Sequence, residues 1–342
     1  MPLSSHHSSA LSAKQDMIQI DHVTKNFGKH SAVNDLTFEF PRGKIVGLIG
    51  PSGCGKTTTV RLMTGIYHPT SGAINIFGTD PRNFSQKDRE NIGYMTQLFT
   101  LYPDLTVSEN LNFAASMYGK DLFGRIKRIR ELLEFVELTE HRRKLAHNIS
   151  GGMQRRLSLA ATLVHNPDLL FLDEPTAGID PILRRKFWDQ FAELKNLGKT
   201  LLVTTQYVNE AAYCDLVGIM ADGHMIMLET PGDLMQKALG GDVIDLKPHS
   251  PLTQEQFSEL SNLPFVVKVL KLSDGIIRMT VDESSTALPA TMTWLGERDV
   301  VVDTLEEYYP PFDDVFVKII EDYQNKTVVQ NEPVNLAAGA LA

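Results

Sequence analysis

The feature that most constrains this chain is a glycine-rich octapeptide placed between a strand and a helix. Residues 50–57, GPSGCGKT, match G-x-x-x-x-G-K-[ST], after the apolar run 44–50 and at the start of a helical stretch over 56–66. Glycines let consecutive backbone N–H groups curl around phosphate oxygens, because no Cβ obstructs the approach. A mere glycine-rich turn is the alternative, but the flanking strand and helix favour a phosphate-binding loop. The expected nucleotide contacts are Gly50, Pro51, Ser52, Gly53, Cys54, Gly55, Lys56 and Thr57.

Two side chains of this loop have distinct expected roles. Lys56 would reach the β- and γ-phosphates of a nucleotide, and the Thr57 hydroxyl would bind Mg²⁺. The helix that follows adds the positive end of its dipole. Cys54 lies close to that helix start, so we expect a lowered thiol pKa and a modifiable cysteine.

A second motif ends a buried strand with two carboxylates. In residues 168–174, DLLFLDE, the apolar run carries Asp173 to the carboxyl edge of a sheet, where it can hold Mg²⁺ through water. Glu174 is then placed to polarise an attacking water. An Asp-Glu pair at a strand end is usually a solvated loop. Behind a complete phosphate loop, it indicates Mg-dependent nucleoside triphosphate chemistry.

A third motif lies between these two. Residues 148–156, NISGGMQRR, open a helix with an apolar face, and Ser150 can act as its N-cap. Its exposed N–H groups form another anion site, although a lone serine-glycine cap usually does no more than begin a helix. One nucleotide has no need of two such helix ends from one chain. Two chains related by a two-fold axis would share them, with the loop from one subunit and the cap from the other.

With these motifs in this order, residues 17–240 resemble the ATP-binding cassette (ABC) family. The resemblance implies ATP and Mg²⁺ as ligands and a P-loop NTPase fold, which is an α/β, RecA-like, mostly parallel sheet. It identifies 50–58 as the Walker A loop, 149–153 as the signature and 169–175 as Walker B with a catalytic glutamate. It further assigns Gln97 to the Q-loop, in contact with Mg²⁺ and the lytic water. The nucleotide contacts that it adds are Phe27 stacked on adenine, Thr58, Ser150, Gly151, Gly152 and Asp180 of the D-loop.

The chain departs from the family pattern at two positions. Met153 replaces the signature glutamine, and Gln206 stands where the family usually has a histidine after two threonines. Gln206 can donate an N–H to the γ-phosphate but cannot titrate near neutral pH, so base catalysis is left to Glu174. The segment 203–207, VTTQY, and the closing segment 311–316, PFDDVF, are similar to daunorubicin-resistance-type drug or lipid exporters.

The order of expected elements predicts two domains. Strands alternate with helices up to residue 240, apart from consecutive helices over about 98–165, which predict a helical insertion. Beyond residue 240, a strand–helix–strand–strand–helix–strand order predicts a small α+β domain over 241–324, compatible with a ferredoxin-like fold. We expect a mobile leader over 1–16 and a mobile tail over 325–342. The expected strands are 17–23, 36–40, 44–50, 73–77, 168–173, 199–205 and 215–221, and the further helices 106–118, 125–137, 151–165 and 181–197.

Composition excludes several classes. Residues 241–342 hold 7 Lys+Arg against 17 Asp+Glu, a net of -10, and the remainder is nearly neutral, so no nucleic-acid partner is expected. No stretch of eighteen apolar residues exists, and residues 1–16 lack the pattern of a secretory signal. Cys54 and Cys214 are expected to be free thiols in a reducing compartment. We therefore expect a location at the cytoplasmic face of the cell membrane, with membrane contact through partners only.

The predicted function is the energy-supplying subunit of an exporter. Two copies, or one copy and a paralogue, would close around two Mg-ATP, hydrolyse them and drive export through separate transmembrane permease subunits. The alternative is a soluble ABC ATPase acting on the ribosome or DNA as a regulatory factor. The apolar segment 98–103, LFTLYP, is either core or a groove that receives a short helix of the transporter. Basic side chains within 125–130 and 141–144 are expected to be solvated helix faces.

Overall fold

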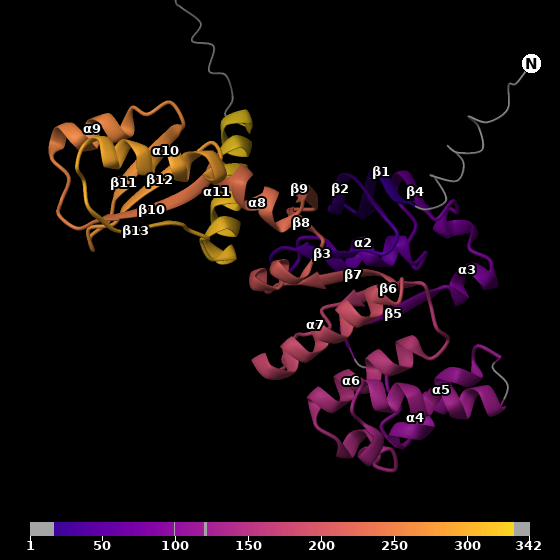
Figure 1. Cartoon of the computed structure of the whole chain (residues 1–342). Coiled ribbons are helices and arrows are strands. Elements are labelled where there is room, and N and C mark those ends of the chain that lie inside the picture. Colours follow the sequence, from indigo (N-terminus) through magenta and orange to yellow (C-terminus); the bar gives the residue numbers. More distant parts are fainter. Residues whose placement is uncertain (1–16, 99, 120–121, 332–342) are drawn as a thin grey trace, which may run out of the picture. The chain divides into compact units, whose positions relative to one another are not determined.

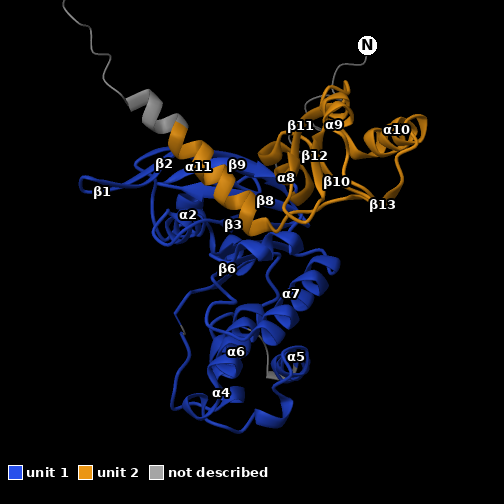
Figure 2. Ribbon diagram, turned by 90° about the vertical axis from the view of Figure 1, so that its left-hand side faces the viewer, with its two compact units in different colours: residues 1–230 blue, residues 231–342 orange. Residues whose placement is uncertain are grey.

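The computed structural model describes residues 17–98, 100–119 and 122–331 (Figure 1). The predicted leader over 1–16 and residues 332–342 of the predicted tail lie outside these ranges. The chain divides into two compact units, residues 1–230 and 231–342, which Figure 2 colours separately. The predicted boundary at residue 240 falls inside unit 2, because α8 (Pro231–Leu239) contacts β10 (Asp242–Pro248) and α11 (Phe312–Asn331).

Unit 1 is built on a six-stranded sheet of order β5-β6-β7-β3-β8-β9. All neighbours are parallel except β8 and β9. The strands β3, β6 and β7 are buried along their whole length, as expected for strands covered on both faces. Because these parallel strands point the same way, the chain segments that follow β3, β5, β6 and β7 meet at one edge. The strands are β3 (Ile45–Ile49), β5 (Ile92–Met95), β6 (Leu169–Asp173), β7 (Thr200–Thr205), β8 (Leu216–Ala221) and β9 (His224–Glu229).

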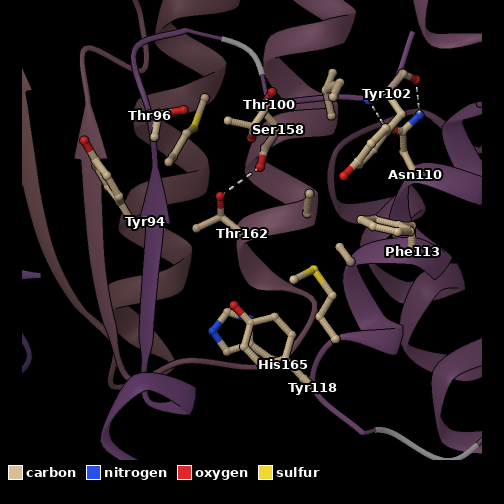
Figure 3. Close-up of a pocket in the computed structure, with 15 residues that line it drawn as sticks. Tyr94, Thr96, Thr100, Tyr102, Asn110, Phe113, Tyr118, Ser158, Thr162 and His165 are labelled. Atoms are coloured by element: carbon tan, nitrogen blue, oxygen red, sulfur yellow. Dashed lines mark hydrogen bonds between the residues drawn. The ribbon is translucent and has the colours of Figure 1, made fainter. Parts of the chain in front are cut away.

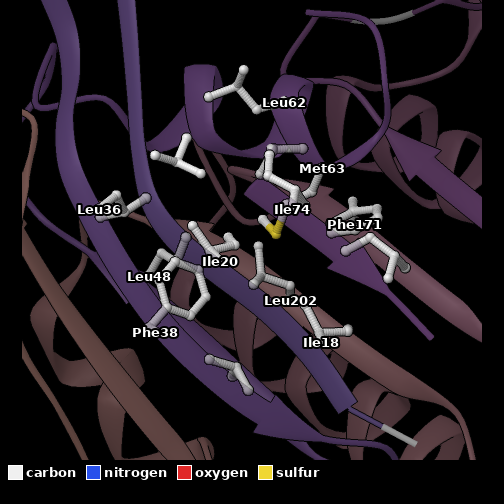
Figure 4. Close-up of a cluster of buried hydrophobic side chains, with 14 of the residues drawn as sticks. Ile18, Ile20, Leu36, Phe38, Leu48, Leu62, Met63, Ile74, Phe171 and Leu202 are labelled. Atoms are coloured by element: carbon white, nitrogen blue, oxygen red, sulfur yellow. The ribbon is translucent and has the colours of Figure 1, made fainter. Parts of the chain in front are cut away.

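A second, antiparallel sheet of order β2-β1-β4 packs near α2, and one hydrophobic cluster joins both to the main sheet. Ile18 and Ile20 of β1 and Leu36 and Phe38 of β2 lie in this cluster with Phe171 of β6 (Figure 4). Burial of these side chains fixes α2, and with it the loop before α2, over the sheet edge. The elements are β1 (Met17–Phe27), β2 (His30–Pro41), α2 (Lys56–Met63) and β4 (Ser71–Ile76).

The predicted helical insertion is confirmed, since α4, α5 and α6 follow one another without a strand and contact one another. A capping box begins α4, where Thr106 Oγ1 accepts from Glu109 N and Glu109 Oε2 accepts from Thr106 N. The remaining elements of unit 1 are η1 (Pro81–Asn83), α3 (Gln86–Glu90), α4 (Val107–Ser116), α5 (Leu122–Phe135), η2 (Thr139–His141), η3 (Ala146–Asn148), α6 (Gly151–Leu163), α7 (Pro181–Asn196) and η4 (Val208–Tyr213).

Unit 2 has the predicted strand–helix–strand–strand–helix–strand order, folded into an antiparallel sheet of order β11-β12-β10-β13. Ile244, Leu246, Ile277 and Met279 of this sheet form a core with side chains of α9 and α10. The predicted tail from residue 325 is wrong for its first part, because α11 continues to Asn331. Besides β10, α8 and α11, the unit contains α9 (Gln254–Ser261), β11 (Val266–Lys271), β12 (Ile277–Val281), α10 (Ser284–Glu297) and β13 (Val302–Glu307).

No helix in the described part of the chain is both long and apolar enough to span a membrane.

Candidate functional site

The glycine-rich loop lies between β3 and α2, as its sequence predicts. A Cβ on Gly50 would lie 2.3 Å from Met220 O, and Gly55 has φ +109°, so both positions require glycine. Lys56 is buried, and its Nζ donates to Gly50 O at 2.7 Å and to Pro51 O at 3.0 Å. The ammonium group therefore lies inside the loop, where phosphate oxygens would replace these carbonyls as its partners.

Asp173 at the end of β6 meets the loop, although the two are far apart in sequence. Its Oδ1 accepts from Thr57 Oγ1 at 3.0 Å and from Thr204 Oγ1 at 2.6 Å. Its Oδ2 is buried and accepts no hydrogen bond from the residues that the structure describes. A buried carboxylate oxygen without a partner is costly unless a cation binds it, so the residues present fit Mg²⁺.

Glu174 is buried and held by side chains from two other strand ends. Gln97, after β5, donates from Nε2 to Glu174 Oε2 at 2.9 Å. Gln206, after β7, donates from Nε2 to Glu174 Oε1 at 2.8 Å. The structure therefore brings together the three residues that sequence reasoning assigned to catalysis.

The other predicted nucleotide contacts lie at a different place on the chain. Ser150 caps α6 by accepting from Met153 N at 3.3 Å, and Asp180 caps α7 by accepting from Leu183 N at 3.0 Å. Ser150, Gly152 and Asp180 line a separate cavity of about 460 Å³. Gly151, at the first position of α6, is exposed. No hydrogen bond within the described ranges joins Ser150 or Asp180 to the glycine-rich loop.

Phe27 at the end of β1 is a partly exposed aromatic platform. Its ring packs edge-on against Tyr67 with centroids 5.3 Å apart, and Lys25 Nζ lies 5.1 Å from its centroid. Lys25 also donates to His68 O at 2.8 Å, which fixes its position. The ring is 43% exposed, which leaves it free to stack with a planar base.

Comparisons with known proteins agree with this geometry. A profile of the ABC transporter family matches residues 33–177. Over 229 residues, the chain is 39% identical to the linearmycin resistance ATP-binding protein LnrL of Bacillus subtilis, which covers 67% of this chain and 73% of LnrL. This chain belongs to the ABC transporter family.

A similar share of this chain also matches other ABC proteins. The probable multidrug ABC transporter ATP-binding protein YbhF of Escherichia coli is 38% identical over 251 residues, 72% of this chain but only 42% of YbhF. The Nod factor export ATP-binding protein I of Burkholderia lata is 37% identical, covering 69% of this chain and 78% of that protein. A solved dimeric ABC cassette, MJ0796 bound to ADP and Pi, has a TM-score of 0.58 and 27% identity, covering 62% of this chain and 98% of that one.

Arg155 is the residue of this ABC cassette that sequence reasoning missed. It lies on α6, is buried, and donates from Nη1 to Gln97 O at 2.8 Å and from Nη2 to Ala177 O at 3.4 Å. Burial lowers the pKa of Arg155, and the nearby charges of Glu174 and Asp173 offset this only in part. The guanidinium thus connects the helix of the signature with the Q-loop and with the segment before Asp180. The sequence alone did not indicate this role, because arginine side chains are mostly solvent-exposed in proteins.

The expectation for Cys54 is wrong. The thiol is buried, and burial raises its pKa, which outweighs the charge of Lys56 and the hydrogen bonds that lower it. Cys54 is therefore a small packing residue below the loop in the described structure, not an activated thiol. Cys214 is also buried and free, as expected.

A groove of about 300 Å³ begins beside the Q-loop and runs between β5, α4 and α6 (Figure 3). Tyr102 and Phe113 meet edge-on at its rim with centroids 4.5 Å apart, and Met117 is 71% exposed. Asn110 holds the loop by accepting from Tyr102 N and donating to Tyr102 O. The expected apolar segment 98–103 thus contributes to a groove, although Phe99 lies outside the described residues.

Proposed function

We propose that this chain is the ATP-hydrolysing subunit of an ABC exporter, peripheral at the cytoplasmic face of the cell membrane and bound to membrane-spanning permease subunits. The observation that carries the proposal is the environment of Glu174. Both of its carboxylate oxygens accept from glutamine amides, 2.9 Å and 2.8 Å away, beside the buried Asp173. A carboxylate so oriented at the mouth of a phosphate loop is suited to accept a proton from an attacking water.

The loop binds the triphosphate, and its neighbours complete a Mg²⁺ site. Lys56 exchanges its two backbone carbonyl partners for β- and γ-phosphate oxygens. Thr57 Oγ1 and the free Asp173 Oδ2 would hold Mg²⁺, directly or through water, with Gln97 as a further ligand. When bound, Mg²⁺ neutralises charge that develops on the phosphates.

Glu174 acts as the base, and the two glutamines position it. Gln97 and Gln206 restrain both oxygens before the nucleotide arrives, so little reorganisation remains when water is bound. Gln206 replaces the usual histidine as a donor only, since an amide does not titrate near neutral pH.

Dimerisation completes each site. The Ser150 cap with Gly151 and Gly152 presents helix N–H groups to the γ-phosphate that Lys56 of the other chain holds. ATP binding then favours the closed dimer, because only that state gives the phosphate donors from both chains. The dimeric assembly of the solved cassette MJ0796 supports this part of the proposal.

The names of the relatives concern drug resistance and export. LnrL is named for linearmycin resistance, YbhF for multidrug transport and the Burkholderia protein for Nod factor export. With VTTQY and PFDDVF, they support a drug or lipid exporter of the daunorubicin-resistance type. The second cassette is a second copy of this chain or a paralogue.

Steady-state ATPase assays test the chemistry. Glu174→Gln should retain ATP binding and lose most Mg-dependent turnover, by about 100-fold or more, because the base is gone while its amide partners remain. Gln190→Ala is the matched control, since Gln190 Nε2 donates to Phe135 O on the helical insertion and not to Glu174. Turnover in Glu174→Gln equal to wild type would remove Glu174 from the reaction.

Co-purification from detergent-solubilised membranes tests the permease. The groove between β5, α4 and α6, which begins beside the Q-loop, is the surface that a short permease helix would occupy. Met117→Asp should lose the co-purifying hydrophobic chain, and Leu197→Asp, at an equally exposed position (69%) outside the groove, should retain it. Retention by both variants would place the permease contact elsewhere.

A further inference from the structure

Unit 2 contains a cavity of about 610 Å³ at the end of its sheet, between the end of β10, the start of α9 and the turn that joins β11 to β12. We call it the β10–α9 cavity. This volume falls in the range of small-molecule sites. None of the residues assigned to ATP chemistry lies in unit 2, so the cavity shares no residue with the ATP site.

The floor of the cavity is apolar and continuous with the core of the unit. Ile277 is buried in that core, and Leu252 and Phe257 pack against it while lining the cavity. Pro248, also buried, completes the floor. An apolar chain or ring placed here would cover side chains that the fold leaves half-open to water.

The rim carries two carboxylates and two ammonium groups, and within the described residues only the carboxylates form hydrogen bonds through their side chains. Asp303 Oδ1 lies 3.0 Å from His249 Nδ1, and Asp274 Oδ1 accepts from Ile276 N at 3.3 Å. Lys247 and Lys271 line the same cavity and form no ion pair or side-chain hydrogen bond with any residue in the described ranges.

The cavity lining thus has two lysines and two aspartates, a balanced formal charge, in a unit that is acidic as a whole. Residues 241–342 carry a net charge of -10, from 7 basic and 17 acidic residues. Lys271 is also the cross-strand partner of Ile277, so its aliphatic stem starts beside the apolar floor. An unpartnered ammonium group beside an apolar surface matches a ligand that has an anionic head and an apolar body.

We propose that the β10–α9 cavity binds a small amphipathic organic anion, of which a medium-chain carboxylate is the simplest example. Its apolar part contacts Leu252, Phe257 and Ile277, and its carboxylate accepts from Lys271, with Lys247 nearby.

Isothermal titration of the full chain with octanoate tests the site, with octylammonium and octanol as probes of equal chain length and different charge. We expect saturable octanoate binding at one site per chain, and binding of the other two at least about tenfold weaker. Octylammonium or octanol binding as tightly as octanoate would overturn the anion assignment, and no saturable binding of octanoate would overturn the site.

Two exposed lysines on β11 give a matched pair of variants. Lys271→Glu should weaken octanoate binding by about tenfold or more, and Lys268→Glu, on the same strand but outside the cavity, should leave it within about twofold. Equal loss in both would indicate a general charge effect and would refute the site. Neither residue lies in the ATP site, so ATPase activity measured on the same samples reports separately on the proposed function.

Discussion

Replacing Gln206 tests the catalytic arrangement where this chain differs from its family. Gln206→Ala removes an N–H donor that lies 2.8 Å from Glu174 Oε1. A hydrogen bond to a charged group contributes about 1.5–3 kcal/mol, and each 1.4 kcal/mol is a factor of ten in rate. We therefore expect kcat to fall by roughly 10- to 100-fold. ATP affinity should change by less than about threefold, because Lys56 and the loop hold most of the triphosphate.

The assay is Mg-dependent phosphate release as a function of ATP concentration, together with equilibrium binding of ATP. Gln206→His is the informative companion, because an imidazole keeps a donor and adds a group that titrates near pH 6.5. Gln206→His should recover part of kcat. Its kcat should also depend on pH near neutrality, an effect that the wild-type glutamine cannot cause because it does not titrate there. Unchanged turnover in Gln206→Ala, or a loss confined to ATP affinity, would refute the assigned role.

Three further predictions concern Arg155, Cys54 and Asp215. Arg155→Gln should lower kcat by about tenfold or more with little change in KM for ATP. The reason is that the Gln97 backbone carbonyl loses the guanidinium group that holds it. Equal effects on kcat and KM would contradict this role. Cys54 should react with iodoacetamide at pH 8 at least about tenfold more slowly than free cysteine, because burial raises its pKa, and Mg-ATP should slow it further. Burial raises the pKa of Asp215, but hydrogen bonds from a backbone N–H and Lys195 outweigh it and lower the pKa below its usual value. Asp215→Asn should therefore reduce the free energy of unfolding by roughly 1–2 kcal/mol at pH 7. The difference from wild type should begin to shrink as the pH falls below about 4 and should go on shrinking as the pH passes through the lowered pKa of folded Asp215; a difference that stays constant as the pH falls below about 4 would contradict the charge argument.

The sequence was sufficient to predict the residues that meet at the edge of the parallel sheet. Asp173 ends a strand, and Glu174, Gln97 and Gln206 follow strands; parallel strands bring such positions together whatever their separation in sequence. The two residues predicted to hold Mg²⁺ do lie together, since Thr57 Oγ1 donates to Asp173 Oδ1. Their roles in ATP hydrolysis remain predictions.

What the sequence did not predict depends on tertiary packing. Arg155 contacts backbone carbonyls, which no side-chain pattern reveals. The raised pKa of Cys54 follows from burial, whereas its position near a helix start pointed the other way. The strand β9 has no alternation of buried and exposed positions, and β5 has only four residues, so neither gave a periodic signal.

The boundary and tail of unit 2 were missed for a related reason. The helix α8, which begins with Pro231 and Gly232, is not among the helices predicted from the sequence. The helix α11 extends past the predicted end of the domain, because its stability comes from contact with α8 and not from a strong amphipathic pattern of its own.

The central claim is that the loop of one chain and the Ser150 cap of another bind the same ATP. The most direct test is the mass of the Glu174→Gln chain in solution, measured by sedimentation equilibrium with and without Mg-ATP. We predict a monomer without nucleotide and a dimer with Mg-ATP, since blocked hydrolysis preserves the shared phosphate contacts. A monomer in saturating Mg-ATP, both alone and with its co-purified permease, would contradict the account.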